Sequence, residues 1–240
     1  TMRVGFLVLD VRGTATPNSP LRDVKVRQAI NYAIDRETMS KNLVRGGSKP
    51  AYAACYHTQF GCDDTLVTRY PYDPAKAKAL LKEAGYANGF ETDFYAYRER
   101  DYAEAVIGYL RNVGITAHLH WMQSSAMSKM MREGKTPIAF QTWASLSVND
   151  ASAFTGVYFK GGSDDLAKDP QVDEWVRTAD AATDPDMRKQ NYAKALQRIS
   201  EQAYWAPLFT YSTNYAYTSD LNFQGYPDEL PRFYEASWKD

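Results

Sequence analysis

The stretch that decides how the chain folds is residues 20–36, which read PLRDVKVRQAINYAIDR. After Asp23, apolar side chains recur at helical spacing: Val26, Ala29, Ile30, Ala33 and Ile34. An aspartate at this place accepts hydrogen bonds from the free N–H groups that open a helix. The stretch therefore predicts a helix that starts after Asp23 and packs one apolar face against a core.

Working outward, the same kinds of signal recur along the chain. Residues 4–9 form a short apolar run that predicts a buried strand. Asp35 opens a second short helix that ends near residues 46–47, both glycines. Three later helices are each expected to start at an aspartate followed by a proline, at Asp73-Pro74, Asp169-Pro170 and Asp184-Pro185. The carboxylate caps the helix, and proline loses no hydrogen bond at the first helical position.

Expected strands alternate with these helices. They are residues 90–97, 115–122, 138–143, 208–211 and 214–218, with helices at 102–113 and 124–133 between the first three. Alternation of this kind predicts an α/β fold with a mixed sheet flanked by helices. Because neither an internal repeat nor a long linker is visible, we expect a single domain of 240 residues.

Composition excludes several functions. Twenty-eight basic and 29 acidic residues leave a net charge of −1, so we expect no nucleic-acid partner. The longest apolar run is far too short to cross a bilayer. The sequence lacks a phosphate-binding glycine loop and a Gly-x-Ser-x-Gly elbow, and its three histidines leave little room for a triad. We therefore expect neither enzymatic activity nor a cofactor.

His118 and His120 leave one alternative open. At alternate positions of an expected strand they point to one face, which is usable chelate geometry. A metal site needs three or four ligands, and no third one is marked nearby. We expect a polar, exposed strand face and no metal site.

Cys55 and Cys62 lie close together, with a spacing that fits neither a zinc site nor a redox Cys-x-x-Cys motif. They are either two reduced buried thiols or a disulfide formed in an oxidising compartment. We favour the disulfide, which would stabilise the chain by about 2.5 kcal/mol through closure of a short loop.

Residues 20–36 resemble the signature of family 5 extracellular solute-binding proteins, which include the dipeptide-, oligopeptide- and nickel-binding components of ABC importers. Further segments match that family in the expected order. They are residues 72–85 (from YDPAKA to LLKEAG), 114–117 (GITA), Trp143 with the loop after it, and 231–239 (PRFYEASWK). The resemblance covers essentially the whole chain.

The resemblance implies one lobe of the clamshell fold of periplasmic binding proteins. Residues 1–240 would be the C-terminal lobe, with 219–240 crossing back toward a missing N-terminal lobe, so that the sequence is a truncated piece. A monomeric binding protein would capture a peptide or other small solute, close, and deliver it to a membrane permease. The family implies the periplasm, reached with a signal peptide that this sequence lacks. A nickel-type metal binder and a sensory or chaperone-like use are the alternatives.

Two regions are expected to touch the solute. The first is the turn after the strand at 90–97, where Tyr97, Arg98 and Arg100 face the family's cleft. Two arginines there could clamp a carboxylate or phosphate, and we favour such a role for one of the two. The alternative is a solvated turn with an Arg–Glu surface pair that contributes little. The second is the strand end that carries Gln141, Trp143 and Ser145, where Trp143 serves either the ligand or the core.

The loop after Trp143 departs from the family. Peptide-binding members carry there an aspartate that pairs with the peptide amine, and this sequence has Leu146. Asn149 and Asp150 follow in the same loop, but the simpler role of Asp150 is to cap a helix that starts near Ala151. The resemblance therefore points to a solute that is not held by its amine, such as an anionic or polyol-like solute, an opine or a modified peptide.

Overall fold

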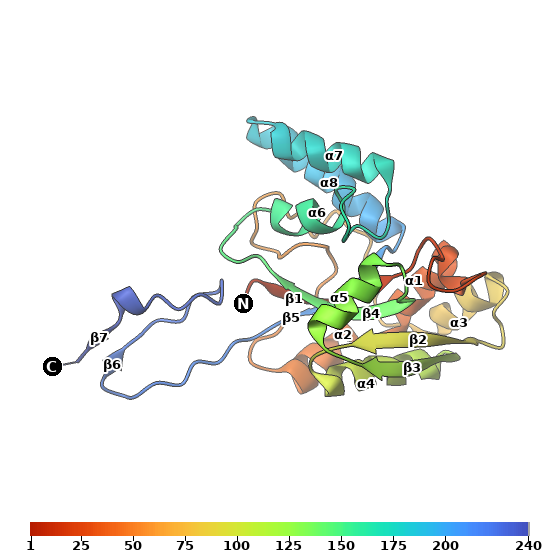
Figure 1. Ribbon diagram of the computed structural model, residues 1–240, viewed down its shortest axis with the longest axis horizontal. Coiled ribbons are helices and arrows are strands. Elements are labelled where there is room, and N and C mark those ends of the chain that lie inside the picture. The colour runs from red at the N-terminus through yellow and green to blue at the C-terminus, as the bar shows by residue number, and fades with distance from the viewer. Residues whose placement is uncertain (240) are drawn as a thin grey trace.

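The computed structural model describes residues 1–239 and is built on a five-stranded mixed sheet with the order β3-β2-β4-β1-β5 (Figure 1). The strands are β1 (Arg3–Leu9), β2 (Phe90–Ala96), β3 (Ile115–Trp121), β4 (Ile138–Ala144) and β5 (Trp205–Thr210). β2 pairs in parallel with β3 and β4, whereas β1 pairs antiparallel with β4 and β5. The carboxyl ends of β2, β3, β4 and β5 therefore share one edge of the sheet with the start of β1.

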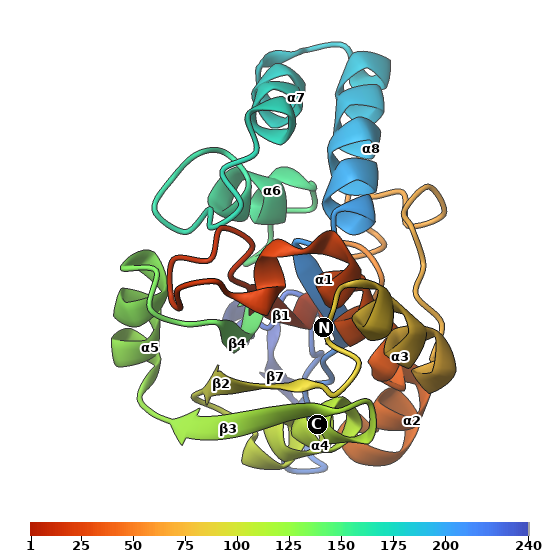
Figure 2. The same ribbon diagram turned by 90° about the vertical axis from the view of Figure 1, so that its right-hand side faces the viewer.

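Helices cover both faces, as the α/β pattern predicts (Figure 2). One face carries α1 (Val24–Ala33), α2 (Arg36–Thr38) with the π-helical turn Met39–Val44, α3 (Pro74–Glu83) and α4 (Arg100–Asn112). The other carries α5 (Ser124–Arg132), α6 (Ser152–Tyr158), α7 (Pro170–Ala181) and α8 (Pro185–Glu201). Within residues 1–239, no helix has the length and apolar character that crossing a membrane requires.

After Arg3 at its start, β1 is apolar because its two faces pack against two different cores. Leu7 and Leu9 join the core under α1, α3 and α4, while Phe6 and Val8 join the core under α6, α7 and α8. Phe6 stacks on Trp205 with ring centroids 3.7 Å apart. A central strand buried on both faces has no exposed side on which to place polar residues.

The predicted helix caps are confirmed. Asp23 accepts from the Lys25 N–H, and Asp73 accepts from the Lys76 N–H, each at 2.8 Å. Asp169 and Asp184 cap α7 and α8 in the same way. The capping aspartates in the sequence therefore predict correctly where these helices begin.

The strand expected at residues 208–211 begins earlier, at Trp205, and includes Pro207. This is an edge strand, where proline is tolerated because its missing N–H interrupts no central ladder. On its outer side, the Ala51 N–H donates to the Leu208 carbonyl at 3.1 Å.

The prediction of a strand at residues 214–218 is wrong. This segment belongs to an extended tail, residues 212–239, that leaves the body beyond β5 (Figure 1). Its tyrosines alternate as in a half-buried strand, but Tyr215 and Tyr217 pack on Phe223 within the tail and no sheet strand pairs with them. The only regular elements of the tail are β6 (Leu221–Asn222), β7 (Ser237–Trp238) and a 3-10 turn at Phe233–Glu235. Residue 240, the end of the segment expected to cross back, lies outside the described residues.

Candidate functional site

The carboxyl edge of the sheet gathers four segments that are far apart in sequence. They are the turn after β2, the loop after β4 (residues 145–151, here the β4 loop), the start of the tail and the N-terminus. In α/β folds, ligands bind in the crevice outside the carboxyl ends of the strands. This edge is therefore the place to look for a binding site.

A cavity of about 170 Å³ opens at this edge and brings together three of the residues expected to touch the solute: Tyr97, Gln141 and Trp143. Gln141 and Trp143 share one face of β4 because they are two residues apart. The remaining walls include Met131 and Arg132 from α5 and Tyr158 from α6. We call this space the β4 cavity.

Several contacts fix the side chains around the β4 cavity. The Trp143 indole N–H donates to the Ala153 carbonyl at 2.7 Å, and its ring meets Tyr158 edge-on at 5.5 Å. Gln141 Nε2 donates to Met131 Sδ at 2.8 Å. Aromatic rings held in this way present rigid apolar faces to a ligand at little entropic cost.

The β4 cavity offers polar groups but little net charge. Burial raises the pKa of the Tyr158 phenol, so it stays a neutral hydroxyl at physiological pH. Arg132 and Asp164, which both line the cavity, pair with each other at 2.9 Å. Such a lining offers hydrogen-bonding groups to a small polar ligand.

The two arginines expected to clamp the solute lie outside the β4 cavity. Arg98 pairs with Glu99 at 2.6 Å and lies over the Tyr211 ring at 5.3 Å. Burial alone would lower the pKa of Arg98, but the hydrogen bond and the negative charge of Glu99 have the larger combined effect and raise it. Arg100 pairs with Glu104 at 2.7 Å on the exposed side of α4. Both arginines are paired within the lobe.

The remaining expected residues lie on the β4 loop. Ser145 is buried, and its N–H donates to the Met2 carbonyl. Asn149 is exposed, and its carbonyl accepts from the Phe60 N–H at 3.1 Å. None of the three β4-loop residues Ser145, Asn149 and Asp150 lines the β4 cavity.

Asp150 acts as a helix cap, the simpler of its two expected roles. Its Oδ1 accepts from the Ser152 N–H at 2.9 Å and from the Tyr192 hydroxyl at 3.1 Å, while Oδ2 accepts from Arg188 at 2.8 Å. Burial would raise the pKa of Asp150, but these partners outweigh it and lower the pKa. Both oxygens of this carboxylate are therefore occupied by groups of the same chain.

The base of the tail folds back onto the same edge. Asp228 accepts from the Ser147 hydroxyl on the β4 loop at 2.7 Å and from Arg232 at 2.8 Å. Glu229 binds Arg3 of β1 through both carboxylate oxygens. The hydrogen bonds from Arg232 are the main reason why the pKa of Asp228 falls to about 2.

Acid is expected to release the base of the tail from the β4 loop. Asp228 titrates at about 2 in the folded protein against an ordinary 3.8, so its stabilising effect is complete above about pH 4. That effect disappears as the pH falls through about 2, where the folded carboxylate takes up its proton. Carbon NMR of the Asp228 carboxyl group measures this titration directly. A midpoint near 4 would contradict the assigned contacts, and Asp228→Asn is expected to lack the transition.

The disulfide between Cys55 and Cys62 is confirmed, with the two Cα atoms 5.9 Å apart. It closes residues 55–62, here the disulfide loop. The expectation of a metal-free strand face at His118 and His120 stays a prediction. His120 contacts Asp93 at 2.8 Å and His118 contacts Glu91 at 3.3 Å, and nowhere in residues 1–239 do three or more such side chains gather to hold a metal ion.

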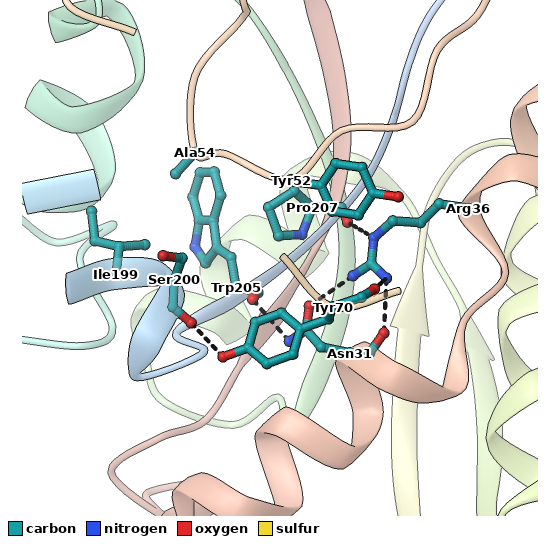
Figure 3. A pocket seen from close by; sticks show the side chains of 9 residues that line it. All are labelled: Asn31, Arg36, Tyr52, Ala54, Tyr70, Ile199, Ser200, Trp205 and Pro207. Atoms are coloured by element: carbon teal, nitrogen blue, oxygen red, sulfur yellow. Dashed lines mark hydrogen bonds between the residues drawn. The ribbon is translucent and has the colours of Figure 1, made fainter. Parts of the chain in front are cut away.

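The stretch that decides the fold serves structure and lies away from the β4 cavity. Arg36 is buried beside a small cavity of about 10 Å³, whose lining side chains Figure 3 shows. Its guanidinium donates to the carbonyls of Pro207 at 2.6 Å, Asn31 at 2.8 Å and Tyr70 at 3.3 Å, and to Asn31 Oδ1 at 2.7 Å. These bonds tie the end of α1 to β5 and to the segment before α3.

The β4 cavity is small and polar, and it lies at the carboxyl edge of the sheet, where α/β folds bind ligands. The chain belongs to the bacterial extracellular solute-binding proteins of family 5, whose middle-region profile matches residues 1–165. These are binding proteins of ABC importers, and clamshell structures share the fold. HbpA2 from Haemophilus parasuis superimposes with a TM-score of 0.83 at 25% identity, over 99% of this chain and 48% of that one.

Curated relatives agree with this assignment. A glutathione-binding protein GsiB of Pectobacterium atrosepticum is 30% identical over 90% of this chain and 45% of its own length. The dipeptide-binding protein of Escherichia coli is 27% identical over 84% of this chain and 39% of its own. Heme-binding protein A of Haemophilus influenzae is 27% identical over 80% and 37%. The chain thus spans less than half the length of these relatives.

Proposed function

We propose that the chain is the C-terminal lobe of the substrate-binding component of an ABC importer. It captures a peptide-like or other small polar solute, including an anionic one, in a cleft against an N-terminal lobe and delivers it to a membrane permease. The protein works as a monomer in the periplasm. The observation that carries the proposal is the β4 cavity, because it places Tyr97, Gln141 and Trp143 at the edge where such folds bind ligands.

The tail supports an arrangement in which residues 219–240 cross toward the other lobe. Phe233, Tyr234 and Trp238 are 72%, 82% and 70% exposed. Exposed aromatic groups of this size are typical of a surface that another part of the protein covers. The relatives are more than twice as long as this chain, which leaves room for such a part in the longer protein.

The solute is not recognised through its amine by the β4 loop. The only carboxylate in this loop, Asp150, is occupied by Arg188, Tyr192 and the Ser152 N–H. Leu146, at the position of the family's amine-binding aspartate, is 58% exposed and apolar. A modified peptide is one solute that fits these facts, and the GsiB relatives are named for binding glutathione.

Acetylating the amine of a bound dipeptide is therefore expected to weaken affinity by less than about tenfold. A charged hydrogen bond is worth about 1.5–3 kcal/mol, so losing a true amine–carboxylate pair would cost tenfold to more than a hundredfold. Calorimetric titration of the full-length protein with matched free and N-acetylated dipeptides measures the difference. Affinity that depends a hundredfold on the free amine would overturn this part of the proposal.

Replacing Trp143 by alanine is expected to weaken solute binding about thirtyfold, or about 2 kcal/mol, as for a buried aromatic anchor. Trp143→Phe keeps most of the ring area but loses the hydrogen bond from the indole N–H to the Ala153 carbonyl. Its affinity for the solute is therefore expected to lie between those of the wild-type protein and Trp143→Ala. Trp121→Ala is the matched control, because Trp121 is 44% exposed and lies outside the β4 cavity. Equal affinities for the Trp143 and Trp121 variants would place the solute elsewhere.

A further inference from the structure

The disulfide loop lies directly against the β4 loop. Gln59 Nε2 donates to the Val148 carbonyl at 3.1 Å. The Phe60 N–H donates to the Asn149 carbonyl at 3.1 Å, and the Ala151 N–H donates back to the Phe60 carbonyl at 2.9 Å. Three hydrogen bonds thus hold three residues of the β4 loop, Val148, Asn149 and Ala151, to two residues of the disulfide loop.

The β4 loop needs such support because its own conformation is strained. Leu146 and Ser147 have φ angles of 47° and 72°, in the left-handed region. For residues other than glycine this costs about 1–2 kcal/mol each. Leu146 and Val148 are 58% and 46% exposed, so burial of their side chains does little to hold the loop in place.

The disulfide loop is itself rigidly placed. Gln59 is buried, and its Oε1 accepts from the Tyr56 N–H at 2.8 Å. The Phe60 ring lies against α8, with the Arg188 guanidinium 4.9 Å from its centre. Arg188 also pairs with Asp150, so one side chain of α8 steadies both loops. The disulfide between residues 55 and 62 restricts this loop in the unfolded chain. Less chain entropy is therefore lost when the loop becomes ordered in the folded protein.

We propose that the disulfide loop is a clamp that sets the conformation of the β4 loop, with Gln59 and Phe60 as positioning residues for solute binding. The effect on binding rests on the proposed function, whereas the clamp itself does not. Neither residue lines the β4 cavity, so they act through the backbone of residues 148–151 and through the exposed side chains next to it.

Amide hydrogen exchange in the full-length protein tests the clamp without any ligand. Two variants open the clamp differently. Cys55→Ser with Cys62→Ser removes the covalent link. Gln59→Ala keeps the disulfide but removes the hydrogen bond to the Val148 carbonyl and the one from the Tyr56 N–H. We expect exchange of the Ala151 amide to speed up about tenfold or more in both, with amides of β2 unchanged. Asp63→Asn is the matched control, because Asp63 bonds only to Thr65 just beyond the loop. Unchanged exchange at Ala151 in Gln59→Ala would overturn the clamp, even if the double serine variant unfolds.

Titration with a dipeptide panel that includes Met-Leu then separates the two proposals. Faster exchange together with weaker binding supports both the clamp and the solute site. Faster exchange with unchanged binding supports the clamp but contradicts the role of Gln59 and Phe60 as positioning residues for solute binding. The conservative variant Gln59→Glu keeps the length of the side chain but loses the Nε2 donor, and we expect it to behave as Gln59→Ala does.

Discussion

Replacing Arg36 by methionine is expected to lower the free energy of unfolding by about 4 kcal/mol, a large share of the stability of a domain of this size. Arg36 is only 3% exposed, and its partners are neutral carbonyl and amide oxygens from three segments. Burial lowers the pKa of Arg36 to about 10, so it still carries its charge at neutral pH. Methionine fills the space but leaves the carbonyls of Pro207 and Tyr70 without their donor, and each costs about 1–3 kcal/mol.

Denaturant unfolding followed by circular dichroism measures this loss as a shift of the midpoint at constant slope. Arg111→Met is the control, because Arg111 lies on the exposed side of α4 and is expected to change stability by less than about 0.5 kcal/mol. Arg36→Lys is also expected to destabilise strongly, since an ammonium lacks the planar fork that reaches acceptors in three segments at once. If Arg36→Met were as stable as Arg111→Met, these hydrogen bonds would not hold the fold together.

The second large effect is expected at Gly89, where substitution by alanine would cost about 3 kcal/mol or more. Gly89 has a φ angle of 75°, and a Cβ added there would lie 1.8 Å from the carbonyl oxygen of Gly114. That oxygen accepts from the Phe90 N–H at 3.2 Å where β2 and β3 begin, so it has no freedom to move away. The cost is therefore the strain of a left-handed alanine plus a backbone clash.

Gly85→Ala provides a matched control for the clash. Gly85 also has a positive φ of 90°, but a Cβ there would meet no atom within 4 Å. It should cost about 1 kcal/mol, from strain alone. Thermal unfolding of Gly89→Ala and Gly85→Ala measures how much stability each variant loses. Equal losses of stability would contradict the close approach of Gly89 to Gly114 at the start of β2 and β3.

Features that depend on near neighbours in sequence could be predicted correctly. Asp23, Asp73 and Asp184 cap helices because the groups they bind lie two or three residues away. The disulfide between Cys55 and Cys62 also closes a short loop. Residues 20–36 also carry the resemblance to the family, whereas the structural role of Arg36 depends on Pro207 and Tyr70, which are distant in sequence.

Features that depend on distant partners could not be predicted. Tyr158 and Arg132 line the β4 cavity, but nothing in their local sequence signals that α5 and α6 converge there. Arg98 pairs with its neighbour Glu99, as one of the two interpretations of this turn expects, but its place over the Tyr211 ring depends on the segment after β5 lying nearby. The strand prediction at residues 214–218 is wrong for a similar reason. Alternating tyrosines indicate that one side of the segment is covered, but they do not show which part of the chain covers it.

Native mass spectrometry of the full-length protein purified from its host is the most direct test of the central claim that the lobe binds a solute at the β4 cavity. We predict a retained small-molecule mass on the wild-type protein, lost or strongly reduced in Trp143→Ala and kept in Trp121→Ala. A solute retained equally by both variants, with hydrogen exchange showing protection away from Tyr97, Gln141 and Trp143, would contradict the account.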